Sequence, residues 1–188
     1  MEKRMNTWLL LVCILVLAPL VLCFSSCGSG SKNPSGKRYD AGNVSVLCPR
    51  GWMAFPAADS LDEYSGLNDP NSLHLHKGAR DDSDLIRTPG IEVTRFPGDV
   101  TMVVPGKDLY QNSADLPPQS LGGRTWQGFS AVSFGAPMVL LWTRDGGVQL
   151  QAVLWTNMGG TAIALADADV QAILASIEVS DTVQPTAQ

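Results

Sequence analysis

Short, glycine-rich turns separate the apolar runs in the second half of the chain, and they constrain the fold more than any other feature. The runs cover residues 128–134, 138–143, 148–156 and 161–165, and the turns between them are three or four residues long. Two parallel strands need a crossover of a dozen or more residues, whereas short turns join antiparallel neighbours. We therefore expect an antiparallel meander, preceded by strands in 43–48, 73–77 and 91–94.

One strand and one helix stand out by their apolar patterns. Residues 138–142 are apolar at every position, which predicts a strand in the middle of the sheet with both faces covered. Near the end of the chain, apolar residues recur at i, i+3, i+4 and i+7, and Asp167 precedes them as a candidate N-cap. These residues are Val170, Ile173, Leu174 and Ile177. We expect an amphipathic helix here that covers one face of the sheet, and short helices in 57–67 and 104–112.

The amino terminus has the pattern of an export signal. Lys3 and Arg4 precede an apolar run over 8–24, and two serines lead to Cys27. The segment resembles a bacterial lipoprotein signal, and the resemblance implies that Cys27 is lipidated and holds the protein on the extracytoplasmic face of the membrane. Two alternatives stay open. The run of about 17 apolar residues reaches the lower limit for an uncleaved membrane helix, and an ordinary cleaved secretion signal is the other.

Composition divides the chain into four parts. We predict a signal peptide and lipidation site in 1–27, a flexible tether rich in Gly and Ser in 28–42, and a polar disordered tail in 180–188. The remaining 43–179 are long enough for one domain with its own core. The formal net charge is −5, with no basic stripe, so we do not expect a nucleic-acid partner.

Two short motifs add a family resemblance. Pro49-Arg50-Gly51-Trp52 ends an early strand, and Gly-Gly-Arg-Thr-Trp at 122–126 leads into the late hairpins. With the antiparallel strands and the closing helix, these motifs resemble the PsbP/Mog1/DcrB-like superfamily. The resemblance implies an α+β fold, an α/β/α sandwich whose central antiparallel sheet is covered by helices. It also implies a non-enzymatic accessory or binding role, as in many members, several of which are bacterial lipoproteins.

The two histidines are the only candidates for a metal site. On a strand, His74 and His76 would point to the same face, but zinc needs three or four protein ligands. Asp81, Asp82 and Asp84 lack the spacing of a calcium loop, so a solvated acidic turn is the better interpretation. We therefore place both histidines on the outer face of their strand and expect no metal and no cofactor.

No motif identifies a reaction. The sequence has no Gly-x-Ser-x-Gly elbow and no phosphate-binding loop, so we do not expect an enzyme. Cys48 ends an apolar strand and is interpreted as structural rather than as a reactive thiol.

The tryptophans of the mature chain are expected mainly in the core. For an exposed interaction surface we choose Trp126 and Trp155. The sequence thus favours a membrane-anchored accessory or binding module of the cell envelope, whose partner is another envelope protein or an extracellular ligand. A second hypothesis is a small-molecule or metal-binding lipoprotein in which His74, His76 and 81–84 share a pocket, and a third is a divergent hydrolase.

Overall fold

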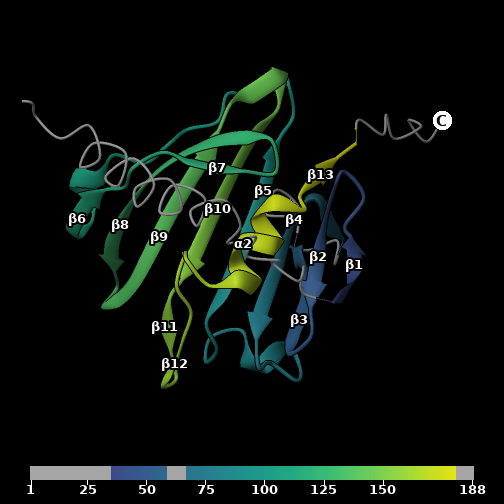
Figure 1. Cartoon of the computed structure of the whole chain (residues 1–188), viewed down its shortest axis with the longest axis vertical. Coiled ribbons are helices and arrows are strands. Elements are labelled where there is room, and N and C mark those ends of the chain that lie inside the picture. Colours follow the sequence, from purple (N-terminus) through teal and green to yellow (C-terminus); the bar gives the residue numbers. More distant parts are fainter. Residues whose placement is uncertain (1–34, 59–66, 181–188) are drawn as a thin grey trace, which may run out of the picture. The chain divides into compact units, whose positions relative to one another are not determined.

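A computed structural model describes residues 35–58 and 67–180 (Figure 1). The predicted signal peptide with Cys27, most of the predicted tether and nearly all of the predicted tail lie outside these residues. Within the described ranges, no helix is long and apolar enough to cross a membrane.

The fold is built on one eight-stranded antiparallel sheet. Its strands are β3 (Trp52–Ala58), β4 (Asn68–Lys77), β5 (Gly90–Phe96), β6 (Gln111–Asp115), β7 (Gln119–Leu121), β8 (Arg124–Ser133), β9 (Ala136–Thr143) and β10 (Gln149–Trp155). They run in the order β3-β4-β5-β10-β9-β8-β6, and β7 pairs with β8. The antiparallel meander predicted for the second half is confirmed for its first three runs, since β8, β9 and β10 are consecutive antiparallel neighbours. The fourth run, 161–165, contains only a two-residue strand that pairs outside the large sheet. The apolar strand β9 lies between the other two, as its composition predicts.

Smaller elements complete the described chain. β1 (Gly36–Asp40), β2 (Val44–Pro49) and β13 (Glu178–Val179) form a three-stranded sheet, and β11 (Asn157–Met158) pairs with β12 (Thr161–Ala162). The helix α2 covers Ala168–Ala175, and single 3-10 turns occupy η1 (Asp82–Asp84), η2 (Lys107–Leu109) and η3 (Asp145–Gly147). Strand β1 lies inside the stretch expected to be a tether. It pairs with β2 through the backbone over five residues, so ordered structure begins before residue 43.

The main core lies on one face of the large sheet, called here the helix face. Alternate residues of the strands point to it, including Leu73, Leu75, Ile91, Leu150 and Leu154, all of which are fully buried. They pack against the helix α2 and against β2 of the small sheet, both of which lie over this face (Figure 1). The predicted helix is confirmed in position: its buried residues are Val170, Ile173 and Leu174, and Ile177 is buried just beyond its end.

The expected α/β/α sandwich is wrong. In the described residues the fold is mostly β, with α2 as the one α-helix. The eight residues of α2 give a helix about 12 Å long, whereas the seven strands in the main order span about 30 Å across the sheet. This helix therefore cannot cover a whole face. Of the two other expected helices, 104–112 contains only the 3-10 turn η2 before β6 begins. In 57–67, residues 57–58 belong to β3 and 59–66 lie outside the described residues. Neither segment has the apolar period that a packed helix needs.

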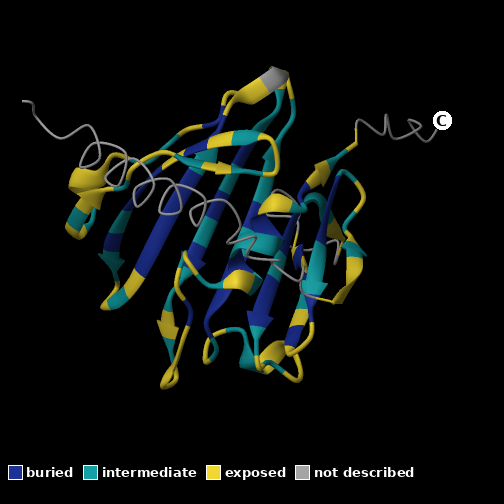
Figure 2. Ribbon diagram, viewed as in Figure 1, coloured by how far each residue is buried: buried dark blue, intermediate teal, exposed yellow. Residues whose placement is uncertain are grey.

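The opposite face of the sheet, called here the open face, is covered by loop and side chains instead of helices. The 97–110 connection runs across this face near the β9–β10 turn. There the backbone N–H of Met102 donates to Gln149 Oε1 at 3.2 Å, and Arg144 donates to the Met102 carbonyl at 3.0 Å. A second apolar cluster lies beneath this connection, formed by Phe129, Ala131, Met138 and Leu140. Figure 2 shows that buried residues follow the strands of the large sheet, while exposed residues gather in the turns.

Leu174→Ala tests the packing of α2 on the helix face. Leu174 is fully buried, so its truncation leaves a cavity and should lower the free energy of unfolding by about 2–5 kcal/mol. The matched control is Leu109→Ala, because Leu109 is 73% exposed and the same change there should cost less than about 0.5 kcal/mol. Urea unfolding of the full chain, followed by circular dichroism, measures both. Equal losses in the two variants would contradict the described packing.

Candidate functional site

A groove on the open face is lined by both histidines, a glutamate and several apolar side chains. It has a volume of about 370 Å³. Its lining residues are His74, His76, Leu85, Ile86, Glu92, Ser133, Phe134, Ala136, Trp155 and Met158. The strands β4, β5 and β10 supply the histidines, Glu92 and Trp155, while the η1 segment, the β8–β9 turn and β11 supply the rim. We call it the histidine groove.

His76 is held in one tautomer by the segment that follows η1. Its Nδ1 lies 3.1 Å from the carbonyl oxygen and 3.2 Å from the hydroxyl oxygen of Thr88. The Thr88 hydroxyl donates to the Asp84 carbonyl at 2.8 Å, so both Thr88 oxygens can only accept from the ring. Nδ1 therefore carries the proton, and Nε2 of the neutral ring is a hydrogen-bond acceptor without a partner among the described residues.

The His76 ring is enclosed on several sides. Gly90 lies opposite it on β5, and a Cβ added there would come within 2.6 Å of His76 Cε1, so only glycine leaves room for the ring. The Phe55 ring approaches at 6.2 Å between centroids in an edge-on arrangement. Burial lowers the pKa of His76, and His74 lowers it further, although the Thr88 hydrogen bond acts in the opposite direction.

His74 and Glu92 face each other on adjacent strands. They are directly paired in the β4–β5 register, and the ring centroids of His74 and His76 are 6.3 Å apart. The two histidines share a face as predicted, but His76 is only 5% exposed, because Phe55 and the η1 segment close over it. Glu92 is half-buried, and its carboxylate forms no hydrogen bond or salt bridge with the described residues.

The acidic turn does not join the histidines as a ligand. Asp81 caps η1 by accepting from the Ser83 backbone N–H at 3.0 Å, and Asp84 accepts from the Arg80 N–H at 3.0 Å. Throughout 35–58 and 67–180, no three His, Cys, Asp or Glu side chains are placed to hold a metal ion. The turn instead carries Leu85 and Ile86 to the rim of the groove.

The two tryptophans chosen as surface residues have different environments. Trp126 is fully buried on the helix face, and its indole N–H donates to the Leu121 carbonyl at 3.4 Å, so its assignment to an interaction surface is wrong. The reason is strand alternation together with β7, which pairs with β8 at this residue. Trp155 is half-buried on the open face and lines the histidine groove.

Phe134, Ile86 and Glu92 are groove residues that the sequence reasoning missed. Phe134 is fully exposed in the two-residue β8–β9 turn, where its φ is +50° and that of Gly135 is +81°. A bulky residue rarely adopts positive φ, and this position of a hairpin turn favours Asn or Gly. The sequence signal that could have identified Phe134 is an aromatic residue directly before a glycine in a predicted turn. Ile86 is 77% exposed, and no sequence signal marked it as a groove residue.

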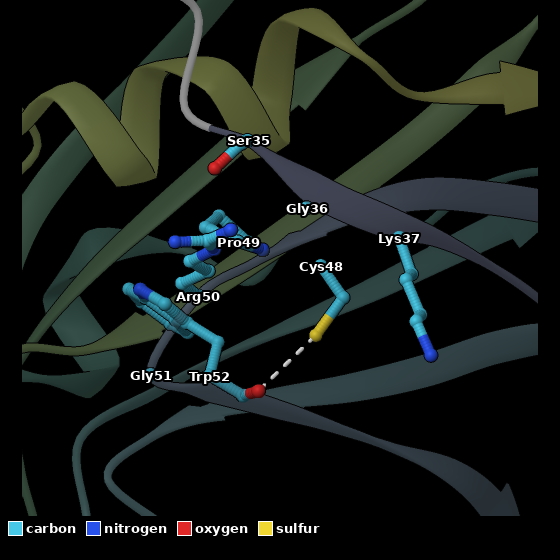
Figure 3. A pocket seen from close by; sticks show the side chains of 8 residues that line it. All are labelled: Ser35, Gly36, Lys37, Cys48, Pro49, Arg50, Gly51 and Trp52. Atoms are coloured by element: carbon cyan, nitrogen blue, oxygen red, sulfur yellow. Dashed lines mark hydrogen bonds between the residues drawn. The ribbon is translucent and has the colours of Figure 1, made fainter.

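A second pocket surrounds Cys48 at the start of the described chain. It has a volume of about 400 Å³ and is lined by 35–37 and 48–52. Figure 3 shows the Cys48 sulfur directed at the Trp52 carbonyl oxygen, to which the thiol donates at 3.4 Å. Burial raises the pKa of the Cys48 thiol, which disfavours the reactive thiolate, and Cys48 is a free cysteine in the described part of the chain. These features favour the structural role predicted for it.

The lowered pKa of His76 makes a pH dependence testable. The unfolded chain binds the proton near pH 6.5 and the folded chain only at lower pH, so the free energy of unfolding should fall as the pH drops from 8 to 5.5. His76→Asn keeps a side-chain donor for Thr88 but removes the titrating ring, and should show a smaller fall. Urea unfolding at the two pH values measures it. The prediction is wrong if both proteins lose the same stability.

Comparison with known proteins gives a distant structural similarity and no family. No family model matches the sequence, and no curated protein matches it. The structure is similar to an uncharacterised protein of Bacteroides thetaiotaomicron VPI-5482, known from a crystal structure at 1.50 Å resolution, with 12% sequence identity and a TM-score of 0.43. The match covers 78% of this chain and 49% of that chain, so this chain spans about half the length of its structural match.

Proposed function

We propose that this protein is an extracytoplasmic lipoprotein, fastened to the membrane through Cys27, that acts as a non-catalytic binding module of the cell envelope. The histidine groove is its binding surface. The observation that carries the proposal is the groove itself, because it keeps apolar side chains exposed beside a half-buried carboxylate that has no partner in the described chain. The export pattern of 8–24 and Cys27 supports the location.

The rim of the groove supports binding. Phe134 and Ile86 are both largely exposed, and Trp155 and Met158 are partly so. Apolar side chains that cluster around a concave site are typical of binding surfaces, whereas single exposed ones need no explanation. The positive φ of Phe134 adds to this argument, because the backbone gains nothing from an aromatic residue at that position.

The surroundings of the histidines support a role without catalysis. In a nucleophile–histidine–acid triad, the histidine Nδ1–H donates to a carboxylate. Here His76 Nδ1 donates to the main-chain carbonyl of Thr88 instead. The raised pKa of Cys48 also argues against a thiolate nucleophile in the pocket around it.

The partner that fits this location is another protein of the envelope. A diacylated cysteine anchors firmly, and confinement near the membrane raises the effective concentration of the module toward its neighbours. A second candidate function, a lipoprotein that binds a small molecule, is favoured by the size of the groove and by His76, a lining residue whose Nε2 has no partner among the described residues.

Cys27→Ala tests the anchor. Mass spectrometry of the membrane fraction should find a diacylglyceryl group on an amino-terminal Cys27 in the wild type, and an unprocessed chain in the variant. Cys48→Ala is the matched control, because it makes the same change at another cysteine. It should keep the lipid, since the proposed attachment site is Cys27. An unmodified Cys27 that still carries residues 1–26 inside the cell would refute the proposed location.

A photo-crosslinking amino acid at position 134 tests the groove as the binding surface. In intact cells, benzoylphenylalanine in place of Phe134 should form an adduct with one envelope protein, and Ile86→Asp should reduce that adduct because it places a charge on the apolar rim. The matched control carries the same crosslinker in place of Leu109, which is also exposed but does not line the groove. Equal adducts at both positions, unaffected by Ile86→Asp, would rule out a specific surface.

A further inference from the structure

We infer that the histidine groove binds an alkylammonium group, with the ammonium at Glu92 and the alkyl chain along the apolar rim. The inference rests on the proposed binding function and specifies the chemistry of its ligand. It follows from three properties of the groove: an unpaired carboxylate, an acceptor nitrogen and an aromatic and aliphatic wall.

Charge is the first property. Glu92 lies on β5 between His74 of β4 and Val153 of β10. The carboxylate is half-buried, and the described chain supplies no cation to it. A charged group that loses part of its hydration without compensation is unfavourable, so a ligand cation would stabilise it. An anionic ligand would be repelled from the same position.

The hydrogen-bonding pattern is the second property. An alkylammonium group carries donors only, so it needs acceptors around it. Glu92 and His76 both line the groove, and because Nδ1 of His76 donates to Thr88, the carboxylate and the Nε2 lone pair are the acceptors that these two residues can supply. The lowered pKa of His76 keeps this ring neutral at pH 7 and preserves the lone pair.

The wall of the groove is the third property. Trp155 and Phe134 line it, and a cation within about 6 Å of an aromatic ring is attracted to its face. Leu85, Ile86 and Met158 offer apolar surface for an alkyl chain. The volume of about 370 Å³ lies within the ordinary range for small-ligand sites.

A metal ion fits the same residues less well. His74, His76 and Glu92 are neighbours, but they are not placed as a set of three metal ligands, and neither is any other group in the described part of the chain. A metal also gains nothing from Trp155, Phe134 and the aliphatic rim. The organic cation accounts for all of these side chains together.

The chain contains only two histidines, and this permits a direct test. Full-length protein is purified from membranes in detergent without a histidine tag and labelled with ¹³C only at histidine Cε1. It should give two ring signals, one from each groove histidine. n-Butylammonium, added at pH 8 where free imidazole is neutral, should shift both signals saturably. Butanol and butyrate, its neutral and anionic counterparts, should not.

Glu92→Gln keeps the shape of the side chain and removes its charge. It should weaken butylammonium binding by about tenfold or more, as expected for loss of a charged hydrogen bond. Glu178→Gln is the matched control, because Glu178 lies in the small sheet and pairs with Arg38, and it should bind like the wild type. Trp155→Phe, which keeps an aromatic ring, should weaken binding by about threefold. Unchanged unfolding by urea shows that the variants are folded.

The outcomes separate this inference from the proposed function. Equal shifts by butanol and butylammonium, full binding by Glu92→Gln, or shifts by Zn²⁺ alone would each overturn the inference. If no ammonium binds while the crosslink at position 134 persists, the inference is wrong and the binding function stands. If butylammonium reduces the crosslink at position 134, the natural alkylammonium group belongs to a lysine of the bound protein. If butylammonium binds without reducing the crosslink, the natural ligand is a small molecule.

Discussion

The pairing of β5 with β10 is the constraint on which the rest of the structure depends. It joins the strands of the first half of the chain, β3 to β5, to the meander of the second half, through a register that runs from Phe96↔Gln149 to Gly90↔Trp155. The same register places Glu92 and Trp155 on one face. A slip by one residue would turn every β10 side chain to the opposite face, and both the core and the groove would be lost.

The alternation of side chains along each strand places aliphatic residues on one face of the sheet and the polar groove residues on the other. The helix face receives the aliphatic residues that pack under α2 and β2, and it also receives Trp126. The open face receives the histidines, Glu92 and Trp155, and only part of it is covered by the 97–110 connection. Stability therefore depends mainly on one side of the sheet. The other side can carry polar groups because it is not needed for the main core.

Local patterns predicted the local structure, and non-local contacts were out of their reach. The short turns predicted β8, β9 and β10, and the apolar stripe predicted α2, because both signals lie within a few residues. The pairing of β5 with β10 joins residues that are 53 to 65 positions apart in the sequence, and no local pattern predicts it. The proximity of His74, Glu92 and Trp155 could therefore not be predicted from the sequence. Strand β1 was missed because its polar sequence pairs through its backbone. The α/β/α sandwich was inferred from a family resemblance, and it needed more helices than the described residues form. One of the segments expected to supply them, 104–112, has no helical period and contains only a 3-10 turn.

If Cys27 is lipidated, the early start of β1 limits how far the folded part can move from the lipid. Only eight residues, 28–35, separate that cysteine from the first paired residue, Gly36. Even a fully extended chain of this length reaches only about 30 Å. A lipidated protein would thus stay within about its own diameter of the bilayer surface, so any molecule that it captures must come close to the headgroups.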